Sequence, residues 1–293
     1  MVLASPAARR RRRSRESGAE VAKAGPLVYV VLALGTALSV FPLYFMFVVA
    51  TRTNDSIGGL PPVLTPGGNL ADNVERLLAN EDAHFLRGLV NSVLVSASVT
   101  VAVVLFSTLA GFAFAKLRFG GRNVLLGLCV ATMMVPTQMG IIPLYMMMAR
   151  LGLAGHLQSV ILPTMVTAFG VFFMRQYIAA GVPDELLEAA YVDGAGTFRT
   201  FLHVVVPAVR PAMAVLGMLT FLATWNDFFW PILALSSQNP TVQVAFQSLA
   251  TGYAPQQSII MAGTLYGTVP VLIAFAFLGK HIVGGIMQGA VKG

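Results

Sequence analysis

Residues 181–210 read GVPDELLEAAYVDGAGTFRTFLHVVVPAVR, and this stretch separates two long apolar segments. Its acidic first half predicts a short helix that begins at Pro183 and Asp184, because proline fixes φ and carboxylates favour the positive end of a helix dipole. Gly194 suits the left-handed position that ends such a helix. A second short helix is expected over 197–206. The stretch is too charged for lipid and too small to fold alone, so we expect it to dock on a partner.

The rest of the chain is rich in apolar residues. Of its 293 residues, 56% are hydrophobic and 11% are charged, whereas an ordinary soluble domain carries about 25% charged residues. Unpaired backbone groups are not tolerated in hydrocarbon, and no barrel-type alternation occurs, so the apolar stretches are expected to be helices. We predict an all-α integral membrane protein with six transmembrane helices, each near the ~20 residues that cross a bilayer. These spans lie at about 27–50, 90–115, 123–148, 157–180, 211–235 and 262–286.

The distribution of lysine and arginine predicts the orientation of these spans. With the N-terminus inside, the inner segments hold 15 of the 19 basic residues, and the outer segments hold four, namely Arg52, Arg76, Arg87 and Arg150. A bias of this size predicts that both termini are cytoplasmic.

Six arginines lie between positions 9 and 15, in a tail over 1–26 that is expected to be disordered. The tail has no aromatic residue on which bases could stack, so we expect it to face anionic lipid rather than nucleic acid. Residues 27–293 are then the membrane domain. Its core covers about 85–285, and the stretch 181–210 is a cytoplasmic loop.

Several other function classes are excluded by what the sequence lacks. The one cysteine, Cys129, permits neither an intrachain disulfide nor a cysteine metal site. No G-x-x-x-x-G-K-[ST] phosphate loop occurs, so the chain is not expected to hydrolyse ATP itself. No catalytic triad or metal-ligand cluster is found, and the four histidines are scattered over different loops or helix ends.

The spacing within the cytoplasmic loop matches a known motif. Glu188-Ala189-Ala190 is followed after three residues by Gly194, and after nine more by Val204-x-Val206-Pro207. This arrangement resembles the EAA loop of ABC importer permeases, whose consensus reads E-A-A, three residues, G, nine residues, I-x-L-P. Valine replaces isoleucine at 204 and leucine at 206. Four further stretches, at 134–155, 178–196, 225–231 and 289–293, resemble the carbohydrate-uptake branch, and within it the shorter permease subunit of the maltose-transporter type.

The resemblance implies a type I ABC importer permease fold with a cytoplasmic coupling helix that contacts an ATPase. The residues that it implies for this contact are Glu188, Ala189, Ala190, Asp193, Gly194 and Pro207. It also implies a second permease subunit, two ATPase subunits, an extracytoplasmic solute-binding protein and a place in the bacterial inner membrane. The chain itself would bind no cofactor, and ATP and magnesium would sit on the ATPase.

A candidate solute path lies in the fifth predicted span. Asp227 is the one acidic residue within any of the six spans, where a charge costs ~2.5–3.5 kcal/mol. Trp225, Asn226 and Trp230 surround it, and on one continuous helix Asn226 and Trp230 would share a face. Aromatic and amide groups suit a sugar, which offers flat apolar faces and hydroxyls. In the alternative interpretation, Asp227 lies near the outer interface and the tryptophans belong to the aromatic belt.

The leading hypothesis is therefore the membrane-spanning subunit of an ATP-driven solute importer. A proton-coupled secondary carrier is the alternative, although such carriers usually show internal helix repeats and several ionisable residues at the midplane. Under either that hypothesis or a passive scaffold, the EAA spacing would be unexplained. The solute stays open between sugars of any length, polyols and glycerol phosphate.

Overall fold

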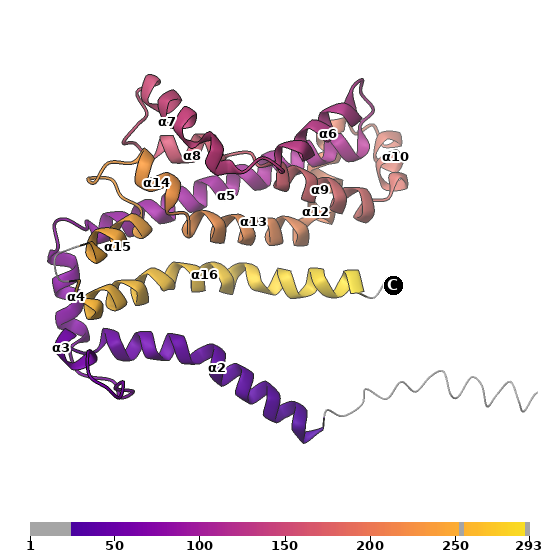
Figure 1. Ribbon diagram of the computed structural model, residues 1–293. Helices are drawn as coiled ribbons and strands as arrows, with labels where there is room; N and C mark the ends of the chain where they lie inside the picture. Colours follow the sequence, from indigo (N-terminus) through magenta and orange to yellow (C-terminus); the bar gives the residue numbers. More distant parts are fainter. Residues whose placement is uncertain (1–24, 252–254, 291–293) are drawn as a thin grey trace, which may run out of the picture. The chain divides into compact units, whose positions relative to one another are not determined.

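The computed structural model describes residues 25–251 and 255–290, and in this part of the chain helices and the loops between them make up the fold, without β-strands (Figure 1). The chain divides into two compact units, residues 1–46 and 47–293. The first unit holds most of α2 (Pro26–Ala50), an apolar helix of 25 residues that is about 38 Å long and can cross a bilayer. The predicted basic tail lies outside the described residues except for positions 25 and 26.

In the second unit, α5 (Phe85–Lys116) is the helix on which the others pack. Its 32 residues correspond to about 48 Å, and it extends the span predicted at 90–115 by a turn at its start. It contacts α9 (Ala168–Gly181) and α13 (Arg210–Trp225), and α13 in turn contacts α16 (Gln257–Ala290). Figure 1 shows α5, α13 and α16 running side by side.

Small residues allow α5 and α9 to approach closely. A Cβ at Gly111 of α5 would lie 2.8 Å from the backbone nitrogen of Arg175, and one at Gly170 of α9 would lie 2.4 Å from the Ser107 hydroxyl. Both distances are shorter than van der Waals contact. Glycine is therefore required at this crossing, as at many membrane helix interfaces.

Two of the six predicted spans are bent rather than straight. The described residues contain three helices that are long and apolar enough to cross a membrane, or up to six if each bent helix pair counts as one span. The expected span 123–148 is divided into α6 (Arg122–Thr132) and, after a short 3-10 turn, α7 (Ile141–Arg150), with a bend of 90°. Pro136 lies at this break. Proline interrupts a helix because it has no N–H for a helical hydrogen bond and because its ring clashes with the preceding turn. The span 157–180 is divided into α8 (Gln158–Thr164) and α9, which meet at 40°.

The prediction for the fifth span, 211–235, is wrong in its second half. Helix α13 ends at Trp225, residues 226–228 are not regular helix, and α14 (Phe229–Ala234) is a separate short helix. Asn226 closes α13 by donating its side-chain amide to the Leu222 carbonyl oxygen at 2.8 Å. Before α13, the short helices that start at Thr197 are tilted by 77° to it.

The segment between α2 and α5, residues 51–84, is a folded element. It contains α3 (Asn54–Ile57) and α4 (Leu70–Ala79), and α4 packs on α16. The buried Asn73 side chain donates to the carbonyl oxygens of Ala50 and Arg52 at 2.9 and 2.8 Å. The uncharged loop between the fifth and sixth spans contains α15 (Val242–Ala250), which packs on α5 and α16.

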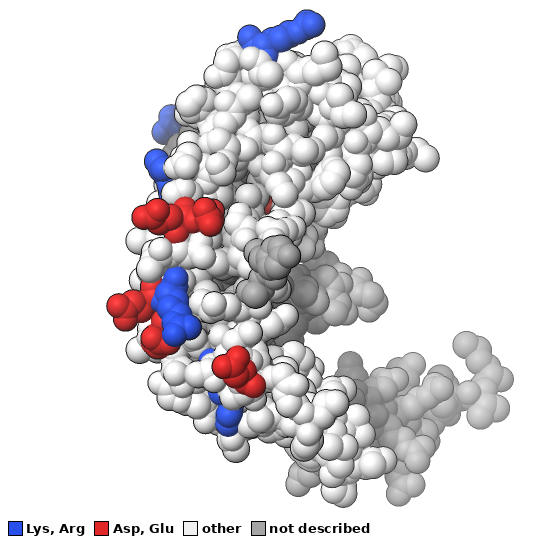
Figure 2. Space-filling view, turned by 60° about the vertical axis from the view of Figure 1, so that its left-hand side comes forward, with Lys and Arg blue, Asp and Glu red and all other residues white. Residues whose placement is uncertain are grey.

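Most of the surface visible in Figure 2 carries no charged side chain. Figure 2 shows a broad area without acidic or basic residues, with the coloured side chains gathered along one side. Many large apolar residues on α5, α6 and α7 are exposed, such as Val101, Leu128 and Ile142. Exposed apolar surface of this extent fits lipid or partner subunits rather than water.

Candidate functional site

The predicted coupling helix is present as α10 (Asp184–Val192), which begins after Pro183. Asp184 and Glu185 occupy its first turn, where carboxylates interact favourably with the helix dipole. Glu188 and Ala189 are exposed on this helix, and Ala190 is half-buried. We call residues 183–208, which include α10 and the short helices that follow it, the α10 segment.

The end of α10 has the hydrogen-bond pattern of a Schellman motif. Gly194 has a φ of +79°, its N–H donates to the Tyr191 carbonyl oxygen at 3.0 Å, and the Ala195 N–H donates to that of Ala190 at 2.9 Å. A Cβ at Gly194 would meet no atom within 4 Å. Glycine is therefore favoured here by its left-handed backbone and not by a lack of space. Asp193 precedes it as an exposed residue of the helix end.

Two contacts hold α10 against the end of α5. The Lys116 ammonium lies 2.6 Å from an Asp184 carboxylate oxygen, and the lysine side chain is 8% exposed whereas the aspartate is 74% exposed. Leu187, the one buried residue of α10, joins the hydrophobic cluster that includes Phe112 of α5 and Phe201. The Lys116–Asp184 pair thus joins α10 to α5.

The exposed surface of the α10 segment carries large apolar side chains as well as polar ones. Val192 is 88% exposed and Phe198 is 66% exposed. Leu186, Tyr191 and Leu202 are also exposed. Exposed large apolar residues in a short polar segment indicate a surface that another protein covers.

A π-helical turn connects the α10 segment to the next long helix. After α11 (Thr197–Thr200), residues Phe201–Val205 form this turn and α12 (Val206–Ala208) follows. The Val206 N–H donates to the Phe201 carbonyl oxygen, five residues back. Pro207 has no N–H to donate to a preceding turn, which gives a physical reason for the wider turn before it.

A cavity of about 540 Å³ lies where α8 and α9 are bent and where α13 ends. We call it the threonine cavity. The residues that line it are Val99, Val160, Thr164, Thr167, Phe169, Leu219, Thr220, Ala223, Thr224 and Asp227. Thr220 and Thr224 lie one turn apart on α13, both half-buried. The Thr164 hydroxyl is used within its own helix, where it donates to the Val160 carbonyl oxygen at 2.8 Å.

Only one of the four residues predicted for a solute path lines this cavity. Asp227 does so, and its carboxylate accepts a hydrogen bond from the Trp230 backbone N–H at 3.5 Å. The prediction that Asn226 and Trp230 share one helix face is wrong, because the helix ends between them.

The two tryptophans are buried in different hydrophobic clusters. Trp225 stacks on Phe221 with ring centroids 5.7 Å apart, and Trp230 donates its indole N–H to the Ser159 carbonyl oxygen at 3.1 Å. Any contribution of these two residues and of Asn226 to a solute path stays a prediction. The α13 threonines were missed, although their spacing of four residues was visible in the sequence.

A family model described as "Binding-protein-dependent transport system inner membrane component" matches residues 104–286, which include α10 and most of the threonine cavity. The chain belongs to this family. It is the permease subunit of an ABC importer, and the alternative of a proton-coupled carrier is not supported.

Curated relatives cover nearly the whole permease. The arabinooligosaccharides transport system permease protein AraQ of Halalkalibacterium halodurans is 32% identical over 278 residues, which are 92% of this chain and 99% of the relative. The lactose transport system permease protein LacG of Rhizobium radiobacter is 34% identical over 265 residues, 90% and 95% of the two chains. The sn-glycerol-3-phosphate transport system permease protein UgpE of Yersinia pestis is 32% identical over 267 residues, 89% and 95%.

A solved structure confirms the fold of the permease. A chain of a bacterial ABC transporter involved in the import of the acidic polysaccharide alginate superposes with a TM-score of 0.76 at 19% identity, covering 96% of this chain and 100% of the other. The predicted all-α membrane fold of ABC importer permeases is therefore confirmed. The permease family is not a family of enzymes.

Proposed function

We propose that this permease takes a sugar or a related polyol or glycerol phosphate from an extracytoplasmic binding protein and passes it through the bacterial inner membrane. Relatives named as permeases of arabinooligosaccharide, lactose and sn-glycerol-3-phosphate transport systems support this solute class. Hydroxyl groups and one carboxylate on a partly apolar wall suit a hydroxylated solute. A second permease subunit would complete the path.

The coupling part of the proposal depends on one observation. Helix α10 is exposed and capped, its Asp184 pairs with Lys116 of α5, and its Leu187 joins the hydrophobic cluster that includes Phe112 of α5. In this proposal it docks on one of two ATPase subunits, which bind ATP and magnesium, while the permease itself binds no cofactor. Closure of the ATPases would displace α10, and Leu187 together with the Lys116–Asp184 pair would transmit that displacement to α5, which also contributes Val99 to the threonine cavity.

Replacement of Glu188 by lysine tests the coupling proposal. The change reverses the charge of an exposed carboxylate in the middle of α10, where a partner could contact it. We expect the ATPase to co-purify poorly and binding-protein-stimulated ATP hydrolysis in liposomes to fall about tenfold or more. Glu185→Lys on the same helix is the matched control. Full ATPase binding and full stimulated hydrolysis in Glu188→Lys would contradict the proposal.

Cysteine labelling tests the proposed orientation. After Cys129 is replaced, single cysteines at Ala71 and Gln238 should react with an impermeant reagent in sealed cells, and one at Val192 should not. Ala71 and Gln238 are exposed and lie in segments expected outside, and Val192 is an exposed residue of α10. Labelling of Val192 from outside would overturn the placement of both termini in the cytoplasm.

A further inference from the structure

The connection between α5 and α6 forms a basic pocket that the coupling proposal does not use. Helix α5 ends at Lys116 and α6 begins at Arg122, with Gly121 in the left-handed region at a φ of +78°. The residues of this turn line an open pocket of about 530 Å³. The residues that line it are Arg118, Phe119, Gly121, Arg122, Asn123 and Val124.

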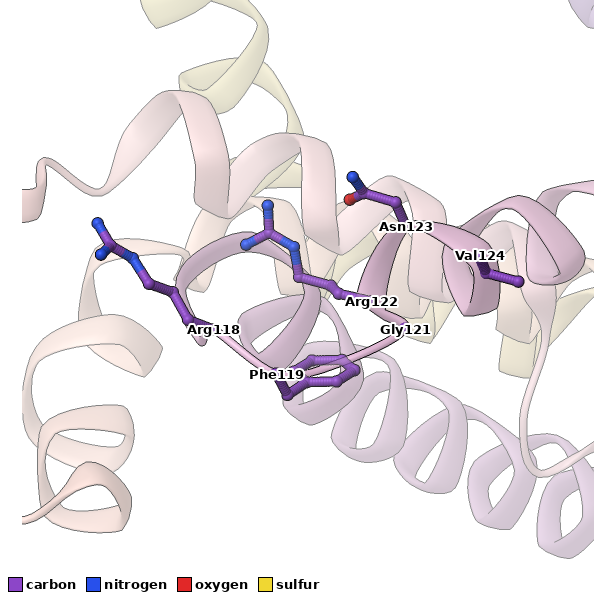
Figure 3. Close-up of a pocket in the computed structure, with 6 residues that line it drawn as sticks. All are labelled: Arg118, Phe119, Gly121, Arg122, Asn123 and Val124. Carbon is purple, nitrogen blue, oxygen red and sulfur yellow. The ribbon is translucent and has the colours of Figure 1, made fainter.

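Two guanidinium groups make this pocket strongly positive. Figure 3 shows the Arg118 and Arg122 side chains extending from the same side of the turn, with the Asn123 amide beyond them. Within residues 25–251 and 255–290, neither arginine forms an ion pair. Arg122 donates one N–H to the Leu117 carbonyl oxygen at 3.1 Å, which orients its guanidinium and leaves its other donors for a ligand.

Phosphate chemistry fits this donor set. Arginine presents a planar fork of donors that matches a phosphate group. Asn123 and Val124 belong to the first turn of α6, so the positive end of the helix dipole adds to the two guanidinium charges. The pocket contains no acidic residue that would oppose an anion.

Apolar residues beside the pocket distinguish a lipid from a free phosphate. Val124 is 67% exposed and Phe119 is 41% exposed at the pocket itself. Leu125 and Leu128 are exposed on the following turns of α6. An acyl chain would cover such residues, whereas inorganic phosphate would leave them in water.

We propose that Arg118 and Arg122 bind the phosphate of an anionic phospholipid whose acyl chains lie along the exposed side of α6. The pocket lies at the same end of α5 as the Lys116–Asp184 pair that holds α10. Its placement in the cytoplasmic leaflet rests on the proposed function, because it assumes that α10 faces a cytoplasmic ATPase. The binding of lipid phosphate does not depend on that assumption.

Native mass spectrometry of the purified full-length chain tests the proposal. The probes are phosphatidylglycerol and phosphatidylcholine with matched acyl chains, together with inorganic phosphate in a separate titration. We expect a clear preference for phosphatidylglycerol in the wild type, and a loss of about tenfold to thirtyfold in its affinity in Arg118→Gln/Arg122→Gln. The matched control is Arg87→Gln/Arg150→Gln, which removes two exposed arginines elsewhere and should keep the preference.

Several results would overturn the proposal. These are equal binding of both lipids by the wild type, an unchanged preference in Arg118→Gln/Arg122→Gln, or an equal loss in the Arg87/Arg150 control. Saturation by inorganic phosphate without a lipid preference would mean that the pocket takes a free phosphate instead. If the glutamine variant does not fold, a phosphatidylglycerol with a photoreactive headgroup replaces it as the test on the wild type. Its cross-links should map to 118–124, and cross-links confined to other segments would overturn the assignment.

The same variants separate this proposal from the coupling proposal. Arg118→Gln/Arg122→Gln should retain the ATPase, and loss of the ATPase with normal lipid binding would show that the pocket contacts protein instead. Retention of the ATPase by Glu188→Lys would defeat the coupling proposal and leave the lipid site unaffected.

Discussion

The α10 segment exposes most of its side chains, whereas the threonine cavity is recessed between α5, α8, α9 and α13. Within this segment, α10 is one short helix with its own start, its own end and a single buried leucine. No single segment of the chain forms the threonine cavity, because its wall comes from four helices and two helix breaks. In the proposed function, α10 moves as a unit, whereas the shape of the cavity changes when one of those helices shifts against another.

The largest expected effect separates backbone conformation from space at the end of α10. Gly194 and Gly196 both have room for a Cβ, but only Gly194 has a positive φ. Gly194→Val should cost about 1–2 kcal/mol in a left-handed position and tilt α10 in its docking site. We expect binding-protein-stimulated ATP hydrolysis to fall about tenfold. Gly196→Val should leave it nearly unchanged, and equal losses in both variants would contradict the role of the Schellman motif.

An intermediate effect is expected from the ion pair that holds α10 on α5. Asp184→Asn leaves the mostly buried Lys116 ammonium without its partner, whereas Lys116→Met leaves an exposed carboxylate that water solvates. We therefore expect about a fivefold loss of coupled uptake in Asp184→Asn and about a twofold loss in Lys116→Met. Uptake per ATP hydrolysed, measured in liposomes, compares the two. A greater loss in Lys116→Met would show that the lysine acts on something other than Asp184.

The smallest effect is expected in the threonine cavity. Thr220→Val and Thr224→Val keep the shape of the wall and remove a hydroxyl that faces the cavity. Loss of one neutral hydrogen bond should raise the KM for uptake about threefold with little change in basal ATP hydrolysis. Thr268→Val is the matched control, because its hydroxyl donates to the Thr264 carbonyl oxygen within α16. A normal KM in both cavity variants would remove the threonines from the solute path.

Local sequence was enough to predict α10 because each end of this helix is determined by residues within a few positions of it. Proline before the first turn, carboxylates within it and a glycine that tolerates positive φ act over a few residues, so no distant contact is needed. The six apolar stretches were predictable for a similar reason, since length and composition alone decide whether a segment suits a bilayer. The family motif then predicted that the loop is a coupling element.

The prediction failed in the second half of the fifth span. Composition continues apolar from 211 to 235, yet α13 ends at Trp225, and the two tryptophans are buried in separate clusters, one with Phe221 and one beside Ser159. Which cluster each tryptophan joins depends on distant residues, and composition does not show it. The break after Trp225 brings Asp227 to the cavity beside Thr224.

Sequence alone therefore determined the membrane class, the positions of the apolar segments and helix α10 with its terminating glycine, because these depend on composition and on contacts over a few residues. Only the tertiary structure decided where the spans bend, that the cavity is lined by threonines and Asp227 rather than by tryptophans, and that Lys116 pairs with Asp184. Those features depend on residues up to 128 positions apart in sequence, as Val99 and Asp227 are in the cavity wall. Which side chains meet across such a separation depends on how whole helices pack, and each helix is placed by all of its neighbours at once.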